Sequence, residues 1–102
     1  MRSPLVTNQI LFQTYTMTTA GTGQQFPDTA IRDGYKTVFK NRLGSTGNFY
    51  LGSSKANVEA TATRKVLEAG ESITVEIDNL NRVWRDADNS VDRLEVTVLA
   101  PS

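Results

Sequence analysis

Residues 86–92, DADNSVD, place oxygen-bearing side chains at alternating positions near the end of the chain. Carboxylate and amide oxygens at this spacing are the ligands that calcium loops use. The run lacks the sharp-turn glycine and the terminal bidentate glutamate of an EF-hand, and Asp and Asn are also ordinary turn residues. Two interpretations stay open, a calcium site and a solvated hairpin loop. We predict the loop, with no bound metal.

Cationic side chains surround the single tryptophan, with Arg82, Arg85 and Arg93 close to Trp84 in the sequence. Aromatic rings among arginines recur at the energetic centres of protein interfaces. The same residue types bind single-stranded nucleic acid by stacking and by phosphate contacts, but the neighbouring aspartates would cancel the positive charge. We therefore predict a protein interface and no nucleic acid, with a plain solvated surface as the alternative. Its candidate residues come from this cluster and from the first strand: Leu5, Ile10, Phe12, Tyr15, Arg82, Trp84 and Arg85.

Residue types that carry catalysis are scarce in this chain. It has no cysteine and no histidine, so it lacks a thiolate nucleophile and the commonest general base. Carboxylate pairs such as Glu68/Glu71 and Glu76/Asp78 can hydrolyse glycosides, but here they fit ordinary exposed turn and strand residues. Residues 44–47, GSTG, lack the lysine and the following helix of a phosphate loop. We predict no enzyme activity, no catalytic residue and no cofactor.

Length and charge define the broad class. A chain of 102 residues is one domain, and eleven basic residues balance eleven acidic ones. A neutral chain has no net field to attract nucleic acid or an anionic membrane. No run approaches the roughly 18 apolar residues of a membrane span, and polar residues interrupt the N-terminal apolar stretch. We expect synthesis in the cytoplasm and no membrane partner.

Alternation of apolar and polar residues is clearest in residues 72–78, SITVEID, which we take as a central strand. Period two puts the branched side chains on one face. Residues 35–43 and 94–99 alternate in the same way, and 83–85 make a short strand. Residues 55–65 favour a helical turn or an irregular excursion. These patterns predict one buried group: Phe39, Ile73, Val75, Ile77, Val96 and Val98.

The N-terminal segment differs from the other predicted strands because residues 5–17 carry apolar groups on both faces. A strand that only closes its own sandwich needs one apolar face. We therefore expect this strand to contact a neighbouring subunit or shell as well as its own domain. Residues 18–28 form a long loop, which Phe26 attaches to the body. The predicted organisation is an N-terminal arm, strand and loop over residues 1–28 and one β-sandwich domain over 29–102.

Short strands about ten residues apart, with turn signals between them, indicate an all-β fold. No helical segment is long enough for the crossovers of a parallel sheet. The predicted fold is a small antiparallel β-sandwich or jelly-roll-like barrel with an extended N-terminal arm.

Four stretches resemble small β-structured virion proteins of tailed bacteriophages: 39–42 (FKNR), 45–52 (STGNFYLG), 67–73 (LEAGESI) and 78–81 (DNLN). In that group a charged strand end leads into a turn, then a short aromatic strand followed by glycine. A Gly-Glu-Ser turn next opens a strand that ends in Asp-Asn-Leu. The resemblance extends over about residues 31–99.

What the resemblance implies is a structural role in the virion. The expected function is that of a capsid decoration protein that stabilises the outer shell of a phage head. Its expected partners are other copies of itself, as a homo-oligomer, and the major capsid protein or another virion protein. A neck or tail component is the alternative within this class. A carbohydrate- or surface-binding β module is the alternative outside it, with Trp84 and Tyr50 as its candidate aromatics.

Overall fold

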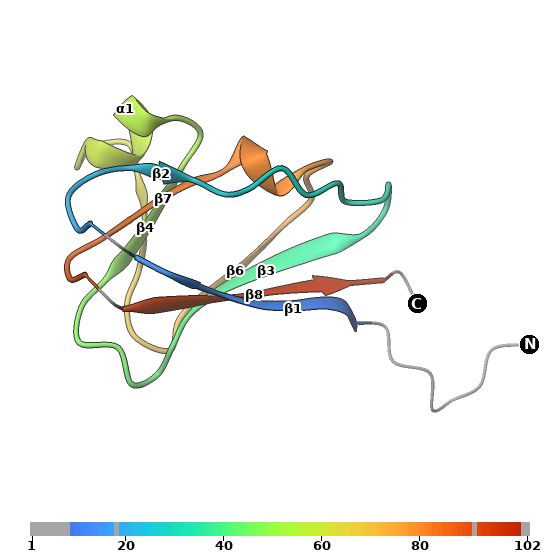
Figure 1. Cartoon of the computed structure of the whole chain (residues 1–102), viewed down its shortest axis with the longest axis horizontal. Coiled ribbons are helices and arrows are strands. Elements are labelled where there is room, and N and C mark those ends of the chain that lie inside the picture. Colours follow the sequence, from blue (N-terminus) through green and yellow to red (C-terminus); the bar gives the residue numbers. More distant parts are fainter. Residues whose placement is uncertain (1–8, 18, 91, 101–102) are drawn as a thin grey trace, which may run out of the picture.

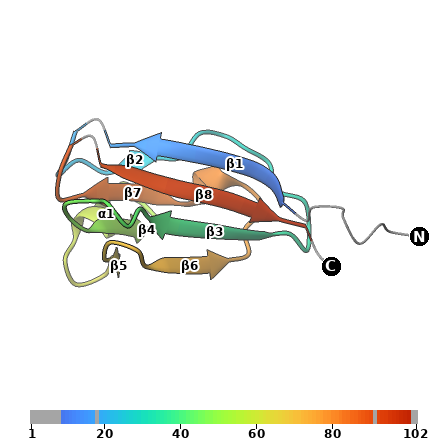
Figure 2. The same cartoon turned by 90° about the horizontal axis from the view of Figure 1, so that it is seen from below.

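Two four-stranded antiparallel sheets make up most of the fold in the computed structural model, which describes residues 9–17, 19–90 and 92–100. The side chains of residues 9–12 also lie outside the described part. Figure 2 shows the first sheet face-on, with strands in the order β1 (Gln9–Thr16), β8 (Arg93–Leu99), β3 (Lys36–Asn41) and β6 (Ser72–Val75). The second sheet has the order β2 (Gln24–Gln25), β7 (Trp84–Ala87), β4 (Phe49–Gly52) and β5 (Lys65–Leu67). The predicted small all-β sandwich is confirmed.

The space between the sheets holds the core. Alternate residues of β3 and β8 face inward, so Phe39, Val96 and Val98 are buried as predicted. From the second sheet, Phe49 and Leu51 meet them. The core also takes in residues from the connections: Met17, Phe26, Ile31 and Leu80.

Strand β6 lies at the edge of its sheet, so the expectation that it is central is wrong. Ile73 and Val75 pack against the core but stay partly exposed, because among the described residues only one side of β6 has a neighbouring strand. Ile77 is also partly exposed, and it lies beyond the end of the strand. The period of two identified the inward face correctly. It carried no information about the position of the strand in the sheet.

Strand β1 pairs with β8 from Gln9 opposite Leu99 to Thr16 opposite Arg93, with a register shift between Gln9 and Leu11. The loop that follows β1 contains the two-residue strand β2, which pairs with β7. Phe26 is buried directly after β2, as the loop prediction required. Residues 9–16 and 24–25 of the predicted arm are therefore hydrogen-bonded into the two sheets. Leu5 lies outside the described residues.

The ambiguous stretch 55–65 begins with a single turn of helix, α1 (Lys55–Glu59), which Figure 1 places beside β4 and β7. The hydroxyl of Ser54 caps it by accepting a hydrogen bond from the Asn57 amide at 3.1 Å. Val58 is fully buried, and the Glu59 carboxylate accepts a 2.6 Å bond from the Gly23 amide. The predicted helical turn is confirmed, and it holds the loop before β2.

Gly52 lets this helix approach β4 closely. A methyl group at residue 52 would lie 2.5 Å from Oδ1 of Asn57 and 2.7 Å from the backbone nitrogen of Val58. Gly52→Ala should therefore push α1 outward and reduce the free energy of unfolding by about 1 to 3 kcal/mol. Chemical denaturation measures the loss. Gly44→Ala is the control, because a methyl group there has no neighbour within 4 Å. Equal effects for the two variants would contradict the close packing.

Candidate interaction surface

Two of the predicted interface residues, Tyr15 and Arg85, come together on the structure. The guanidinium of Arg85 lies 5.3 Å from the Tyr15 ring centre and 4.6 Å from that of Phe26. Its Nη1 donates a 3.1 Å hydrogen bond to the carbonyl of Gln25. Burial lowers the pKa of Arg85, although a guanidinium remains charged in proteins. These contacts fasten the β2 segment onto β1 and β7, so Arg85 has a packing role.

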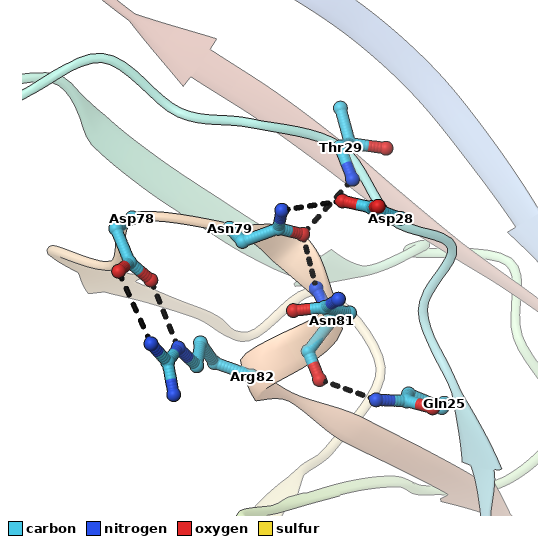
Figure 3. A network of polar contacts seen from close by, with 7 residues as sticks. All are labelled: Gln25, Asp28, Thr29, Asp78, Asn79, Asn81 and Arg82. Carbon is cyan, nitrogen blue, oxygen red and sulfur yellow. Dashed lines mark hydrogen bonds and ion pairs between the residues drawn. The ribbon is translucent and has the colours of Figure 1, made fainter.

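Arg82 and Trp84 have different surroundings. Arg82 forms an ion pair with Asp78 across one turn, at 2.9 Å and 3.2 Å, and both side chains are exposed (Figure 3). Trp84 is half-buried on β7, where its backbone pairs with Gln25 and Gly52. Ile10 and Phe12 lie on β1, but their side chains are outside the described part. The structure therefore joins Arg85 with Tyr15, and it gives Arg82 a different partner.

Asn79 organises the turn that follows β6, as Figure 3 shows. Its side-chain oxygen accepts hydrogen bonds from the amides of Thr29 at 2.9 Å and Asn81 at 3.0 Å. Its side-chain nitrogen donates to Asp28 at 2.6 Å. The bond to Asn81 caps a short 3-10 helix, Leu80–Arg82. The asparagine of this turn thus ties together two segments that are distant in the sequence.

The carboxylates of the predicted acidic loop accept hydrogen bonds from separate protein donors. Asp86 belongs to strand β7 and is buried, where it accepts a 2.9 Å bond from the Gly21 amide. Asp88 accepts bonds from the Tyr50 hydroxyl and from the Asn48 amide. Within the described residues, no three acidic side chains gather closely enough to hold a metal ion. The loop prediction was wrong at its start, because β7 continues through Asp86 and Ala87.

The Tyr50 ring is covered on its outer side. The guanidinium of Arg64 lies 3.5 Å from the ring centre, and Tyr50 itself is 6% exposed. Burial, followed by the hydrogen bond to Asp88, raises the pKa of the Tyr50 hydroxyl. A sugar ring stacks on an open aromatic face, so this tyrosine offers no such platform while Arg64 covers it.

Asp88 should make stability depend on pH. The Tyr50 hydroxyl and then the Asn48 amide lower the pKa of Asp88 by hydrogen bonding to its charged form. Its stabilisation is therefore present above the ordinary aspartate pKa of about 3.9 and is lost as the pH falls through the lowered folded-state pKa. Asp88→Asn should cost about 1 kcal/mol at neutral pH, a low value because Asp88 is exposed.

Melting temperatures at neutral pH and at about pH 3 measure this dependence. The difference between wild type and Asp88→Asn should shrink at the acidic pH. Asp33→Asn is the control, because Asp33 is an exposed turn residue far from this cluster in the sequence. A difference that stays constant with pH would show that the charge of Asp88 contributes nothing.

An apolar groove opens between the two sheets along β6. Its apolar lining comes from Phe39 on β3, Leu51 on β4, Ile73 and Val75 on β6, and Val83 before β7. Lys65 and Arg82 also line it. The sequence predicted the inward face of β6 but missed Leu51 and Val83 as its neighbours. No local signal in the sequence shows which residues of another sheet lie opposite.

No family model matches the chain, and no curated protein or solved structure matches it either. Within the described residues, no helix is long and apolar enough to cross a membrane.

Proposed function

We propose that this chain is a non-enzymatic virion structural protein, a capsid decoration protein that binds the outer shell of a tailed-phage head. The observation that carries the proposal is the first sheet, whose outer strands β1 and β6 each have an edge with no neighbouring strand among the described residues. Such edges bind other chains by strand addition. The partners are further copies of the chain and the major capsid protein or another virion protein, with no nucleic acid or membrane involved.

Three features support an assembly role. The apolar groove beside β6 leaves Ile73 and Val75 partly exposed, and covering them would be favourable. A net charge of zero reduces repulsion between copies. The turn at Asn79, which belongs to the resemblance with virion proteins, braces the segment just past β6.

Electron cryo-microscopy of the parent particle tests this role. Density that fits the two-sheet fold on the outer face of the head is the expected result. The same density at the neck or tail would favour the alternative virion role. Particles that contain no copy of the chain, as measured by mass spectrometry, would contradict a virion role altogether. A glycan array tests the sugar-binding module, and binding that depends on Trp84 would favour that class.

A further inference from the structure

The backbone groups that β6 leaves unpaired within the described part of the chain can be assigned from its pairing with β3. The Asn41 amide donates a 3.0 Å hydrogen bond to the carbonyl of Glu71. In an antiparallel ladder, successive residues direct their N–H and C=O groups to opposite sides. The backbone groups of Asn41 therefore face β6, and so do those of Phe39, two residues earlier. Ile73 lies opposite Phe39, so the N–H and C=O groups of Ile73 and of Val75, two residues later, face β3. The groups of Ser72 and Thr74 therefore point away from the sheet.

This edge lacks the features that commonly protect an exposed strand. Proteins block edges with very short strands, bulges, prolines or lysines. Strands β2 and β5 of the second sheet are only two and three residues long, and the pairing of β1 with β8 has an irregularity between Gln9 and Leu11. The four residues of β6, SITV, have a regular register and contain neither proline nor charge.

We propose that β6 of a second copy pairs antiparallel with this edge across a two-fold axis, which joins the two first sheets into one eight-stranded sheet. The axis passes between the Thr74 residues of the two copies, which therefore lie opposite each other. Ile73 then lies opposite Val75 of the second copy, and the apolar faces of both strands stay on the groove side. A two-fold interface uses the same patch on both subunits, and this strand is complementary to itself in that register.

Charge supports a second copy as the partner. In this register Glu76 of one copy lies opposite Ser72 of the second copy. Within that second copy, Lys40 on β3 lies opposite the same Ser72, on the other side of β6. Glu76 and Lys40 of different copies then project from the same outer face, about 10 Å apart across two strand spacings. Both side chains are exposed, and within the described part of the chain Lys40 forms no ion pair. The small Ser72 leaves room for the two charged groups to approach, and no like charges lie opposite each other.

A seam of four-residue strands buries less area than the roughly 1,200 to 2,000 Å² of a stable interface. The dimer should therefore be weak in dilute solution and favoured where copies are concentrated, as on a shell. It deepens the proposed assembly role by naming the surface that copies share. The proposed virion role and the proposed dimer can be disproved independently. Microscopy of the particle tests where the chain is located, and sedimentation in solution tests the β6 contact alone.

Sedimentation velocity of the purified full chain tests the dimer, over concentrations up to about 1 mM because the contact is weak. Wild type should show a monomer–dimer equilibrium. Thr74→Lys places two ammonium groups opposite each other on the axis and should weaken the dimer about tenfold or more. Thr74 is exposed, so circular dichroism should show an unchanged fold.

Thr14→Lys is the matched control. Thr14 is an exposed threonine on β1, the other edge of the same sheet, and its pairing with Glu95 directs its backbone groups outward too. This variant should dimerise like wild type. A wild type that stays monomeric up to about 1 mM, or equal weakening by the two variants, would overturn the proposal.

A charge exchange tests the register. Lys40→Glu should weaken the dimer, and Lys40→Glu combined with Glu76→Lys should restore it, because the two opposite charges then meet again with their positions exchanged. Both residues are exposed, so neither change should unfold the domain. A double variant that dimerises no better than Lys40→Glu alone would overturn the proposed register.

Discussion

Replacing Phe26 with alanine should lower the free energy of unfolding by about 3 to 5 kcal/mol. The Phe26 side chain is 1% exposed, and its ring centre lies 4.9 Å from that of Tyr15 and 5.2 Å from that of Phe39. The Arg85 guanidinium also packs on it, at 4.6 Å. Truncation leaves a cavity where both sheets and the β2 segment meet. Since domains of this size are stable by about 5 to 15 kcal/mol, much of the total would be lost.

Urea denaturation of the Phe26 variants measures this effect. Phe26→Leu keeps most of the volume and should cost less than about 1.5 kcal/mol. Leu43→Ala is the surface control, because Leu43 is 80% exposed, and its effect should stay within about 0.5 kcal/mol. If Phe26→Ala were as stable as the Leu43 variant, the loop after β1 would not be anchored through this ring.

Replacing Asn41 with aspartate should cost at least about 3 kcal/mol at neutral pH. Asn41 is fully buried at the end of β3, and its side-chain nitrogen donates to the carbonyls of Gly47 at 3.0 Å and Leu67 at 2.9 Å. The aspartate would remove both donors and place a negative charge against two carbonyl oxygens. This single amide connects β3 with the turn before β4 and with the end of β5.

The Asn41→Asp penalty should depend on pH. Burial beside two carbonyl oxygens raises the folded-state pKa of the introduced carboxyl above its unfolded value of about 3.9. The charge penalty is therefore complete above the folded-state pKa and disappears as the pH falls below the unfolded value, where both states are protonated. Unfolding measured at several pH values should show the variant gaining stability relative to wild type as the pH falls.

Asn41→Ala is the comparison for that experiment. It loses the same two hydrogen bonds without adding a charge, so it should cost about 2 kcal/mol with no added pH dependence. A pH-independent penalty for the aspartate variant would mean that its carboxyl group turns out to solvent.

The prediction of the fold from the sequence depended on local patterns. Alternation in residues 35–43 and 94–99 identified the strands β3 and β8 and their inward faces, because side chains of a strand point to opposite sides in turn. Phe26 stood out as an anchor because it is a large apolar residue in an otherwise polar loop. The alanines at 56, 60 and 62 favoured the helical turn at α1. In each case a few consecutive residues carried the information.

The candidate surface depended on contacts between residues far apart in the chain. Whether a strand is central or at an edge is decided by which other strand donates hydrogen bonds to it, and period two is the same in both cases. For that reason the sequence predicted the inward face of β6 correctly, but it wrongly predicted a central position for this edge strand. Arg85 is separated from Tyr15 by 70 positions, and only the pairing of β1 with β8 and of β2 with β7 brings the ring and the guanidinium together. The residue types and faces were thus determined by the sequence, while the open edge and the groove beside it follow from the tertiary pairing of strands.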